Sequence, residues 1–386
     1  MQLSVVILNY NVRYFLETCL VSVQKAIQHI DSEIIVIDNA STDGSCEMIK
    51  ERFPEVYLIE NKENLGFPKG NNIGVEKAKG DYICILNPDT VIAEDTFEKI
   101  LQFAKNQNEL GIIGCKMIDG SGLFLPESKR GVPTPWVAFT KVAGLYKYFP
   151  KSTLFNQYYL QHIPQSSTQK VPILTGAFMF LKRQLYQEVG GFDQDCFMYS
   201  DDVDLSYLVT KKGFSNYYFA DTTIIHYKGE STQKDVLYMK RFQEAMTFFY
   251  KKHFNQSYLF TFFMKIGIKL FAFKKMFTLK TFKATQPECY LIMSDNEALE
   301  DSITSKFNKN TVIINNIEGL RMLIGMAEKS TTEVIFDTNF ISHSDMIQIM
   351  QDINQKNITF KIISRLNDYL IGSNTSEVRG EVIILS

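Results

Sequence analysis

The chain has 386 residues, with 41 Lys and Arg against 43 Asp and Glu and a net charge of −2, which is enough length for two domains or three. This balance neither favours nor excludes an anionic partner, and we expect no nucleic acid among the partners. Six cysteines without a CxxC pair argue against a disulfide framework or a zinc site, and no uncharged run of 18 or more apolar residues indicates a membrane-spanning helix.

Strands and helices alternate over the first ninety residues. Leu3–Leu8 is a buried-strand run that ends in Asn9-Tyr10-Asn11, and no signal-peptide pattern precedes it, so we expect a cytoplasmic protein. The other elements expected here are helices over Tyr14–Ile27 and Cys46–Phe53, strands over Glu33–Ile37, Val56–Ile59 and Tyr82–Leu86, and an irregular Gly/Asn-rich loop with a short helix between the last two strands. This alternation predicts a mostly parallel sheet with one shared carboxyl edge, where Asn9, Asp38, Gly66 and Asp89 fall.

The segment Asp81–Thr90, DYICILNPDT, places an acidic turn directly after a buried strand. Asp89 therefore lies at the edge where open α/β sheets bind ligands. Carboxylate oxygens are preferred ligands of hard divalent cations, and a nucleotide diphosphate would supply the remaining ones. On position alone, an acid after a strand is more often a turn former or a helix cap than a metal ligand.

Seven motifs occur in a fixed order: VVILNYN, VIDNASTDGS, NLGFPKGNNIG, LNPDT, LTGAF, GGFDQDCFMYSDDVDL and HYKGEST. Together they resemble glycosyltransferase family 2, of the GT-A fold, over about residues 1–255. Within that family the chain is most similar to rhamnosyltransferase-like members that build bacterial cell-surface polysaccharides. The resemblance implies an α/β fold with a Rossmann-like, mostly parallel sheet and transfer of a sugar from a nucleotide-diphosphate donor, such as dTDP-rhamnose or a UDP-sugar, to a glycan or lipid-linked acceptor.

The resemblance also implies a donor site at the carboxyl edge. Asp38 would accept a hydrogen bond from the imide N–H of uracil or thymine, and Lys69 would add positive charge near the phosphates. Asn87 stands where many relatives have the first acid of a DxD motif, which leaves Asp89 as the expected metal ligand. The residues assigned to the donor are Asn9, Tyr10, Asp38, Asn39, Gly66, Lys69, Asn72 and Asn87.

Three acids in four residues open a predicted helix at SDDVDL. They would complement the positive end of the helix in any protein. Their mutual repulsion should also favour protonation of one of them, as a general base requires. The motif match makes Asp202 the base, with Asp201 in place of the more usual Glu, and assigns Asp204, Thr175 and Gly176 to the acceptor side. Leu208 replaces an arginine that is common in relatives.

His226 ends a last predicted strand, Thr222–Ile225. A histidine in this position is often structural, but the resemblance makes it a ligand of the metal or diphosphate beside Asp89. The implied reaction is a single displacement with inversion, in which a bound Mn²⁺ or Mg²⁺ stabilises the leaving diphosphate.

Residues 245–283 contain eight lysines, twelve Phe or Tyr and no acid. On a continuous helix, Lys265, Lys269, Lys280 and Lys283 would share one face, which suits an anionic membrane surface on the inner side of a bacterial cell membrane. Packing of the aromatic residues under the catalytic domain is the equal alternative.

Beyond Pro287, five predicted strands and three helices indicate a second, smaller α/β domain. The organisation expected is a glycosyltransferase domain over 1–255, a basic aromatic connector over 256–284 and a C-terminal α/β domain of unknown role over 285–386. Two other functions remain open. A sugar-binding scaffold would tolerate loss of the metal site, yet its acids are present, and a nucleotidyltransferase would need a glycine-containing phosphate loop that NYNVRYF lacks.

Overall fold

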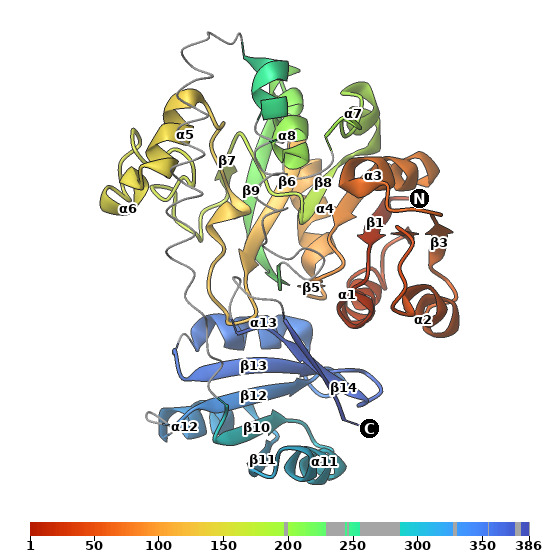
Figure 1. Ribbon diagram of the computed structural model, residues 1–386, viewed down its shortest axis with the longest axis vertical. Coiled ribbons are helices and arrows are strands. Elements are labelled where there is room, and N and C mark those ends of the chain that lie inside the picture. Colours follow the sequence, from red (N-terminus) through yellow and green to blue (C-terminus); the bar gives the residue numbers. More distant parts are fainter. Residues whose placement is uncertain are drawn as a thin grey trace.

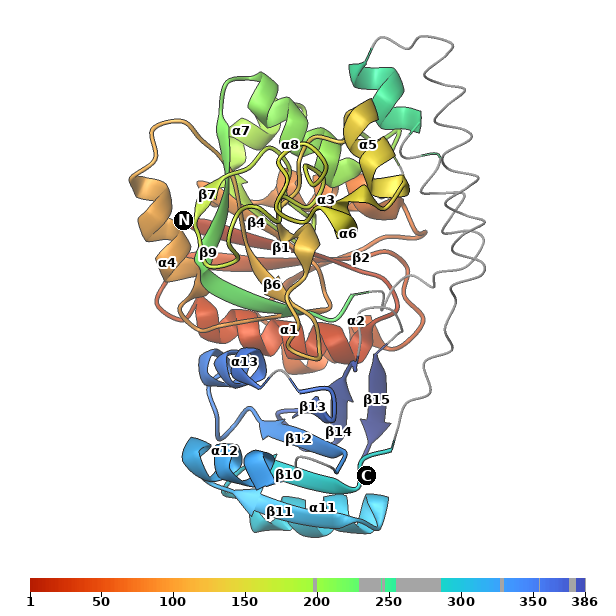
Figure 2. The same ribbon diagram turned by 90° about the vertical axis from the view of Figure 1, so that its left-hand side faces the viewer.

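The computed structural model describes residues 1–196, 200–228, 244, 247–254, 286–326, 330–353, 355–374 and 380–385. Two sheets follow one another along the long axis of the molecule, and helices α1 (Arg13–Ala26) and α13 (His343–Asp352) lie between them (Figure 1 and Figure 2). Across the described residues, no helix is long and apolar enough to cross a bilayer. The expected combination of a mostly parallel central sheet with a second α/β sheet is confirmed.

Four parallel strands form one half of the large sheet, in the order β3-β2-β1-β4. Every residue of β1 is buried, as its apolar sequence predicts. The bounds are β1 (Leu3–Asn9), β2 (Ser32–Asp38), β3 (Tyr57–Glu60) and β4 (Tyr82–Leu86), with α2 (Ser45–Arg52) and α3 (Gly66–Lys77) in the connections. Because the strands are parallel, Asn9 and Asp38 pair directly at the carboxyl edge.

The other half continues from β4 as β8-β6-β9-β5, with β7 paired to β9. The antiparallel pairing of β5 with β9 sets Thr90 opposite His226 and so brings the LNPDT turn to the end of β9. These elements are β5 (Thr90–Ile92), α4 (Thr96–Lys105), β6 (Leu110–Ile118), β7 (Gln169–Lys170), β8 (Phe178–Lys182), α7 (Arg183–Glu188), α8 (Asp201–Lys211) and β9 (Ser215–His226). The strand predicted over Thr222–Ile225 is therefore part of the longer strand β9.

The segment from Gly66 to Lys77 is a helix, so the prediction of an irregular loop there is wrong. Its glycines serve close packing of the helix on the sheet. A Cβ at Gly70 would collide with Leu8, and one at Gly74 would collide with Ile37 and Val6. Tertiary contact therefore outweighs the low helix propensity of Gly and Asn.

Between β6 and β7 the chain forms a segment of turns and short helices without a sheet of its own. It contains a 3₁₀ turn over Pro126–Ser128, α5 (Pro135–Val142) and α6 (Leu145–Tyr148). Pro135 is the first residue of α5, and the Thr134 side chain caps the helix by accepting from the Val137 N–H. In both views α5 lies on the same side of the large sheet as α8 (Figure 1 and Figure 2).

The C-terminal sheet has the order β11-β10-β12-β13-β14-β15, parallel through β13 and antiparallel after it. The five predicted strands are present, and β14, which the sequence analysis missed, makes a sixth. The bounds are β10 (Cys289–Met293), α11 (Glu297–Phe307), β11 (Asn310–Ile314), α12 (Ile317–Met326), β12 (Thr332–Asp337), β13 (Ile358–Ile363), β14 (Tyr369–Gly372) and β15 (Glu381–Ile384).

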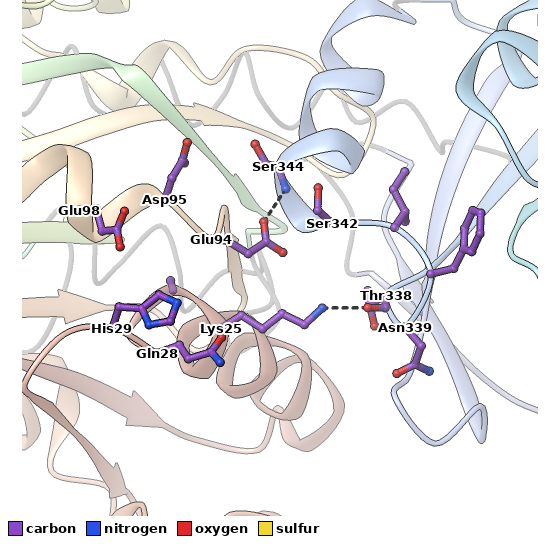
Figure 3. Close-up of a pocket in the computed structure, with 13 residues that line it drawn as sticks. Lys25, Gln28, His29, Glu94, Asp95, Glu98, Thr338, Asn339, Ser342 and Ser344 are labelled. Carbon is purple, nitrogen blue, oxygen red and sulfur yellow. Dashed lines mark hydrogen bonds between the residues drawn. The ribbon is translucent and has the colours of Figure 1, made fainter.

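Polar contacts tie the two sheets together around a cleft of about 640 Å³. Glu94, before α4, accepts hydrogen bonds from the backbone N–H groups of His343 and Ser344 at 2.7 and 2.9 Å, so it occupies the N-terminus of α13 (Figure 3). Burial would raise the pKa of Glu94, but the hydrogen bonds and charge of His343 outweigh it and lower the pKa to about 2. Lys25 Nζ donates to the Thr338 carbonyl at 2.8 Å across the same cleft.

The turn after β6 packs closely against the backbone of the C-terminal region. A Cβ at Gly120 would lie 2.5 Å from the Ser373 carbonyl oxygen, and one at Gly122 would collide with the Met350 carbonyl. Gly122 also has φ +82, which favours glycine. Both positions therefore exclude any side chain.

Candidate functional site

The ends of β1 and β2 form a buried polar pair. Asn9 and Asp38 are 0% and 1% exposed, and Asn9 Nδ2 donates to Asp38 Oδ2 at 2.7 Å. The Ser41 N–H donates to Asp38 Oδ1 at 2.7 Å. Each carboxylate oxygen thus has one protein donor and keeps a free lone pair for another. Asp38 can shape the turn and still accept from a ligand.

An asparagine network joins the turn after β2 to the start of α3. Asn61 Nδ2 donates to Asn39 Oδ1 at 2.8 Å, and Asn39 Nδ2 donates to Asn64 Oδ1 at 3.2 Å. Of the other expected donor residues, Gly66 begins α3 and is buried, whereas Tyr10 and Lys69 are exposed. Tyr10 and Lys69 are thus accessible from solvent.

Asn72 serves a structural contact. Its Oδ1 accepts from the Tyr186 hydroxyl at 2.5 Å and from the Phe192 N–H at 3.1 Å, and its Nδ2 donates to the Phe192 carbonyl at 2.8 Å. Two of these bonds fasten α3 to the GGFD turn, and the third fastens it to α7. Asn72 therefore holds the wall of the site, and its expected contact with the donor stays a prediction.

The candidate metal ligands meet where β5 pairs with β9. His226 Nε2 lies 3.4 Å from Asp89 Oδ1 and 3.3 Å from Asn87 Nδ2. Asp89 and His226 are 5% and 7% exposed, and Asn87 Oδ1 is buried without a hydrogen-bond partner among the described residues. Within the same part of the chain, no group of three His, Cys, Asp or Glu side chains converges. An Asp, a His and an orphaned amide oxygen fit a divalent cation whose other ligands come from a diphosphate.

A second charged pair lies beside this site. Lys228 follows β9 and pairs with Glu127. Burial would raise the pKa of Glu127, but the charges of Lys228 and His226 outweigh it and lower the pKa. The pair therefore leaves a carboxylate and an ammonium group next to His226.

Asp202, in the first turn of α8, has two different oxygens. Asp202 Oδ2 accepts from Arg130 Nη2 at 2.5 Å and from the Gly176 N–H at 3.0 Å. Asp202 Oδ1 is buried and has no hydrogen-bond partner among the described residues. One oxygen is therefore fixed by protein, and the other is free to accept a proton from a bound hydroxyl.

Arg130 holds this arrangement together. Its Nη2 also donates to the Leu174 carbonyl at 2.8 Å, just before the LTGAF motif residues Thr175 and Gly176. Burial would lower the pKa of Arg130, but Asp202 raises it, so the guanidinium stays charged. The pair is mostly buried, with side chains 10% and 13% exposed.

Asp204 has partners different from those of Asp202, namely Lys252 and His253. Its Oδ2 lies 2.8 Å from Lys252 Nζ and its Oδ1 lies 2.5 Å from His253 Nε2. Lys252 also pairs with Asp193 at 2.5 Å. The expected repulsion among the acids is thus offset, because Asp202 and Asp204 each have a cation of their own. Asp201 is buried at the start of α8.

The sequence analysis missed Arg130, Glu127, Lys252 and His253. Arg130 and Glu127 stand in a segment without strand or helix periodicity, which carried no motif. Lys252 and His253 lie in the basic stretch for which a membrane surface and packing under the catalytic domain were equal alternatives. In the structure, both contact Asp204. The other lysines of the membrane hypothesis, Lys265, Lys269, Lys280 and Lys283, lie outside the described residues.

Comparison with known proteins adds a family and several relatives. Residues 4–190 match the model of Glycosyl transferase family 2. An N-acetylglucosaminyl-diphospho-decaprenol L-rhamnosyltransferase of Mycobacterium tuberculosis is 28% identical over 244 residues, which are 60% of this chain and 78% of the relative. A poly(ribitol-phosphate) beta-glucosyltransferase of Bacillus spizizenii is 33% identical over 32% of this chain and 20% of its own length. Among solved structures, a mannosyltransferase of Pyrobaculum calidifontis in complex with GDP-Man and Mn²⁺ has a TM-score of 0.46 at 17% identity and covers 73% of this chain and 76% of its own.

Proposed function

The chain is a glycosyltransferase with a family 2 domain over residues 4–190, and from this premise we propose that it transfers a sugar, with inversion, from a nucleotide-diphosphate donor to a lipid-linked acceptor in cell-surface glycan synthesis. The observation that carries the mechanism is the unpartnered, buried Oδ1 of Asp202. The acceptor class is supported by the name of the mycobacterial relative, whose substrate carries a diphospho-decaprenol lipid.

Asp202 is the general base of this mechanism. Its Oδ1 takes the proton of the acceptor hydroxyl while that oxygen forms the new bond to the anomeric carbon, and the bond from this carbon to the diphosphate breaks. Arg130 and the Gly176 N–H hold Oδ2, which fixes the direction of the basic oxygen. One direct displacement inverts the anomeric centre.

The donor would bind along the carboxyl edge of the parallel strands. Asp38 keeps lone pairs for the imide N–H of uracil or thymine, and Asn9 orients its carboxylate. Asp89 and His226 would hold a divalent cation, Mn²⁺ or Mg²⁺, which when bound neutralises the leaving diphosphate. A lipid-linked acceptor would bring the enzyme to the inner face of a bacterial cell membrane.

The test is transfer to a sugar-diphospho-polyprenol acceptor across a panel of donors that includes dTDP-rhamnose and UDP-sugars. Each donor is assayed with Mn²⁺, with Mg²⁺ and with EDTA, and the anomeric configuration of the product is read by NMR. We expect one preferred donor, loss of turnover in EDTA and an inverted product. Full turnover in EDTA would refute the metal requirement, and a retained configuration would refute the role of Asp202.

A further inference from the structure

Residues 135–154, comprising α5, α6 and the turn that follows, carry an exposed apolar surface that the catalytic mechanism does not use. We call its large members the aromatic patch: Trp136, Phe139, Tyr148, Phe149 and Leu154, which are 42–79% exposed. The other exposed residues of this segment are Pro135, Ala143, Lys147, Pro150, Lys151 and Thr153. Large apolar groups gathered in this way on a surface mark a binding site.

The aromatic patch is held in place by its own contacts. Trp136 Nε1 donates to the Leu154 carbonyl at 2.9 Å. The Trp136 ring lies 5.7 Å from Phe139 and 6.0 Å from Phe155, and Phe149 lies 5.1 Å from Phe155. Trp136, Phe139 and Phe149 therefore pack in place before any partner arrives, which lowers the entropy lost on binding.

The stretch of sequence that carries the aromatic patch has charged residues of one sign only. Residues 128–187 contain no Asp or Glu but include Lys129, Arg130, Lys141, Lys147, Lys151, Lys170, Lys182 and Arg183. Lys129 donates to backbone carbonyls, and Lys141 Nζ lies 3.4 Å from the centre of the Tyr158 ring. Lys147 and Lys151, by contrast, are exposed beside the patch. The surface thus combines exposed aromatic rings with exposed lysines. This combination suits a partner that has an apolar interior and negative charge at its surface.

We propose that the aromatic patch inserts into the interface of an anionic membrane, with Lys147 and Lys151 at the lipid headgroups. Trp and Tyr are favoured at this depth because their rings are amphipathic, and lysines bind anionic lipids electrostatically. This proposal rests on the proposed function, because membrane docking serves catalysis only if the acceptor is lipid-linked. The segment begins five residues after Arg130, which holds Asp202, so docking would set the base close to a lipid-linked acceptor.

The chain contains a single tryptophan, Trp136, which makes the aromatic patch its own fluorescent probe. The full-length protein is mixed with vesicles of phosphatidylglycerol and phosphatidylcholine, or of phosphatidylcholine alone, some carrying brominated acyl chains. We expect a blue shift and bromine quenching of Trp136 on the anionic vesicles, and binding at least tenfold weaker on the neutral ones. Binding without quenching would mean that another segment docks, and a shift that depends on protein concentration without vesicles would mean that a second copy covers the patch. Either result overturns the proposal.

Two variants and a matched control complete the test. The double variant Phe139→Ser, Tyr148→Ser should weaken binding to anionic vesicles about tenfold or more. The double variant Lys147→Glu, Lys151→Glu should weaken binding by a similar factor and should also make binding less dependent on the fraction of anionic lipid. Met322→Ser removes an equally exposed side chain, 61% exposed on α12, and should change nothing. Unchanged binding in both double variants would overturn the proposal. Hydrolysis of a soluble donor, measured in parallel, reports the proposed function separately, because it needs no membrane.

Discussion

Replacing Asp202 by Asn should lower both kcat and the free energy of unfolding, each for a different physical reason. The amide keeps the shape of the side chain but cannot take the acceptor proton, so kcat should fall by about 10²-fold or more. The substitution also removes the counter-ion of Arg130. Arg130 Nη2 lies 2.5 Å from Asp202 Oδ2, and the two side chains are only 10% and 13% exposed, so the guanidinium would stay buried without a partner charge. Removal of one partner from such a pair costs about 3 kcal/mol of unfolding free energy. Donor affinity should be nearly unchanged.

The assay combines kcat at saturating donor and acceptor, donor Kd and urea unfolding for three variants. Asp202→Asn should be slow and destabilised, and Asp201→Asn should lose less activity. The double variant Arg130→Gln, Asp202→Asn removes both charges and should recover much of the stability without recovering turnover. Near-normal kcat in Asp202→Asn, or activity that returns with stability in the double variant, would refute Asp202 as the base.

Three further outcomes are expected. Asp38→Ala should raise the donor Kd while kcat at saturating donor stays within a few-fold, since a contact to the nucleotide base is the same in ground and transition states. Titration calorimetry with the nucleotide measures the Kd. A loss of kcat without a change in Kd would contradict this role. Asp89→Asn should increase the Mn²⁺ concentration that gives half-maximal activity, and an unaltered metal titration would exclude Asp89 as a ligand. Glu94→Gln should lower the unfolding free energy at pH 7 by about 1–2 kcal/mol, as for a carboxylate at a helix N-terminus. Because the folded pKa of Glu94 is depressed, this difference should disappear as pH falls from 4.5 to about 2, and a difference that persists at the lower pH would contradict the assignment.

The sequence predicted the position of the candidate site residues that follow buried strands, and their roles stay predictions. Asn9, Asp38 and Asp89 come directly after apolar runs, and parallel pairing then fixes their common edge. Arg130 could not be found in this way, because the residues around it have no periodicity and it reaches Asp202 only through the tertiary fold. Side-chain pairing of this kind leaves no local mark in a sequence.

The α3 helix shows why amino-acid composition led to a wrong prediction of a loop. Gly and Asn usually indicate loops, yet Gly70 and Gly74 are glycines because α3 packs against Leu8, Val6 and Ile37 without room for a Cβ. Local propensity was thus overruled by contact with the sheet. The acid cluster at SDDVDL misled for a related reason, since the lysine and arginine that neutralise it come from distant segments.

The glycine turn after β6 bears on how the two halves of this chain can be recombined. At Gly120 and Gly122 the main chain of the turn lies against the carbonyl groups of Ser373 and Met350. A chimera that exchanges the C-terminal sheet with that of a relative must therefore reproduce the backbone path at these two points, whatever its surface residues are. Conversely, one added methyl group at Gly122 would clash with the Met350 carbonyl and should strain the contact between the two sheets without altering a charge.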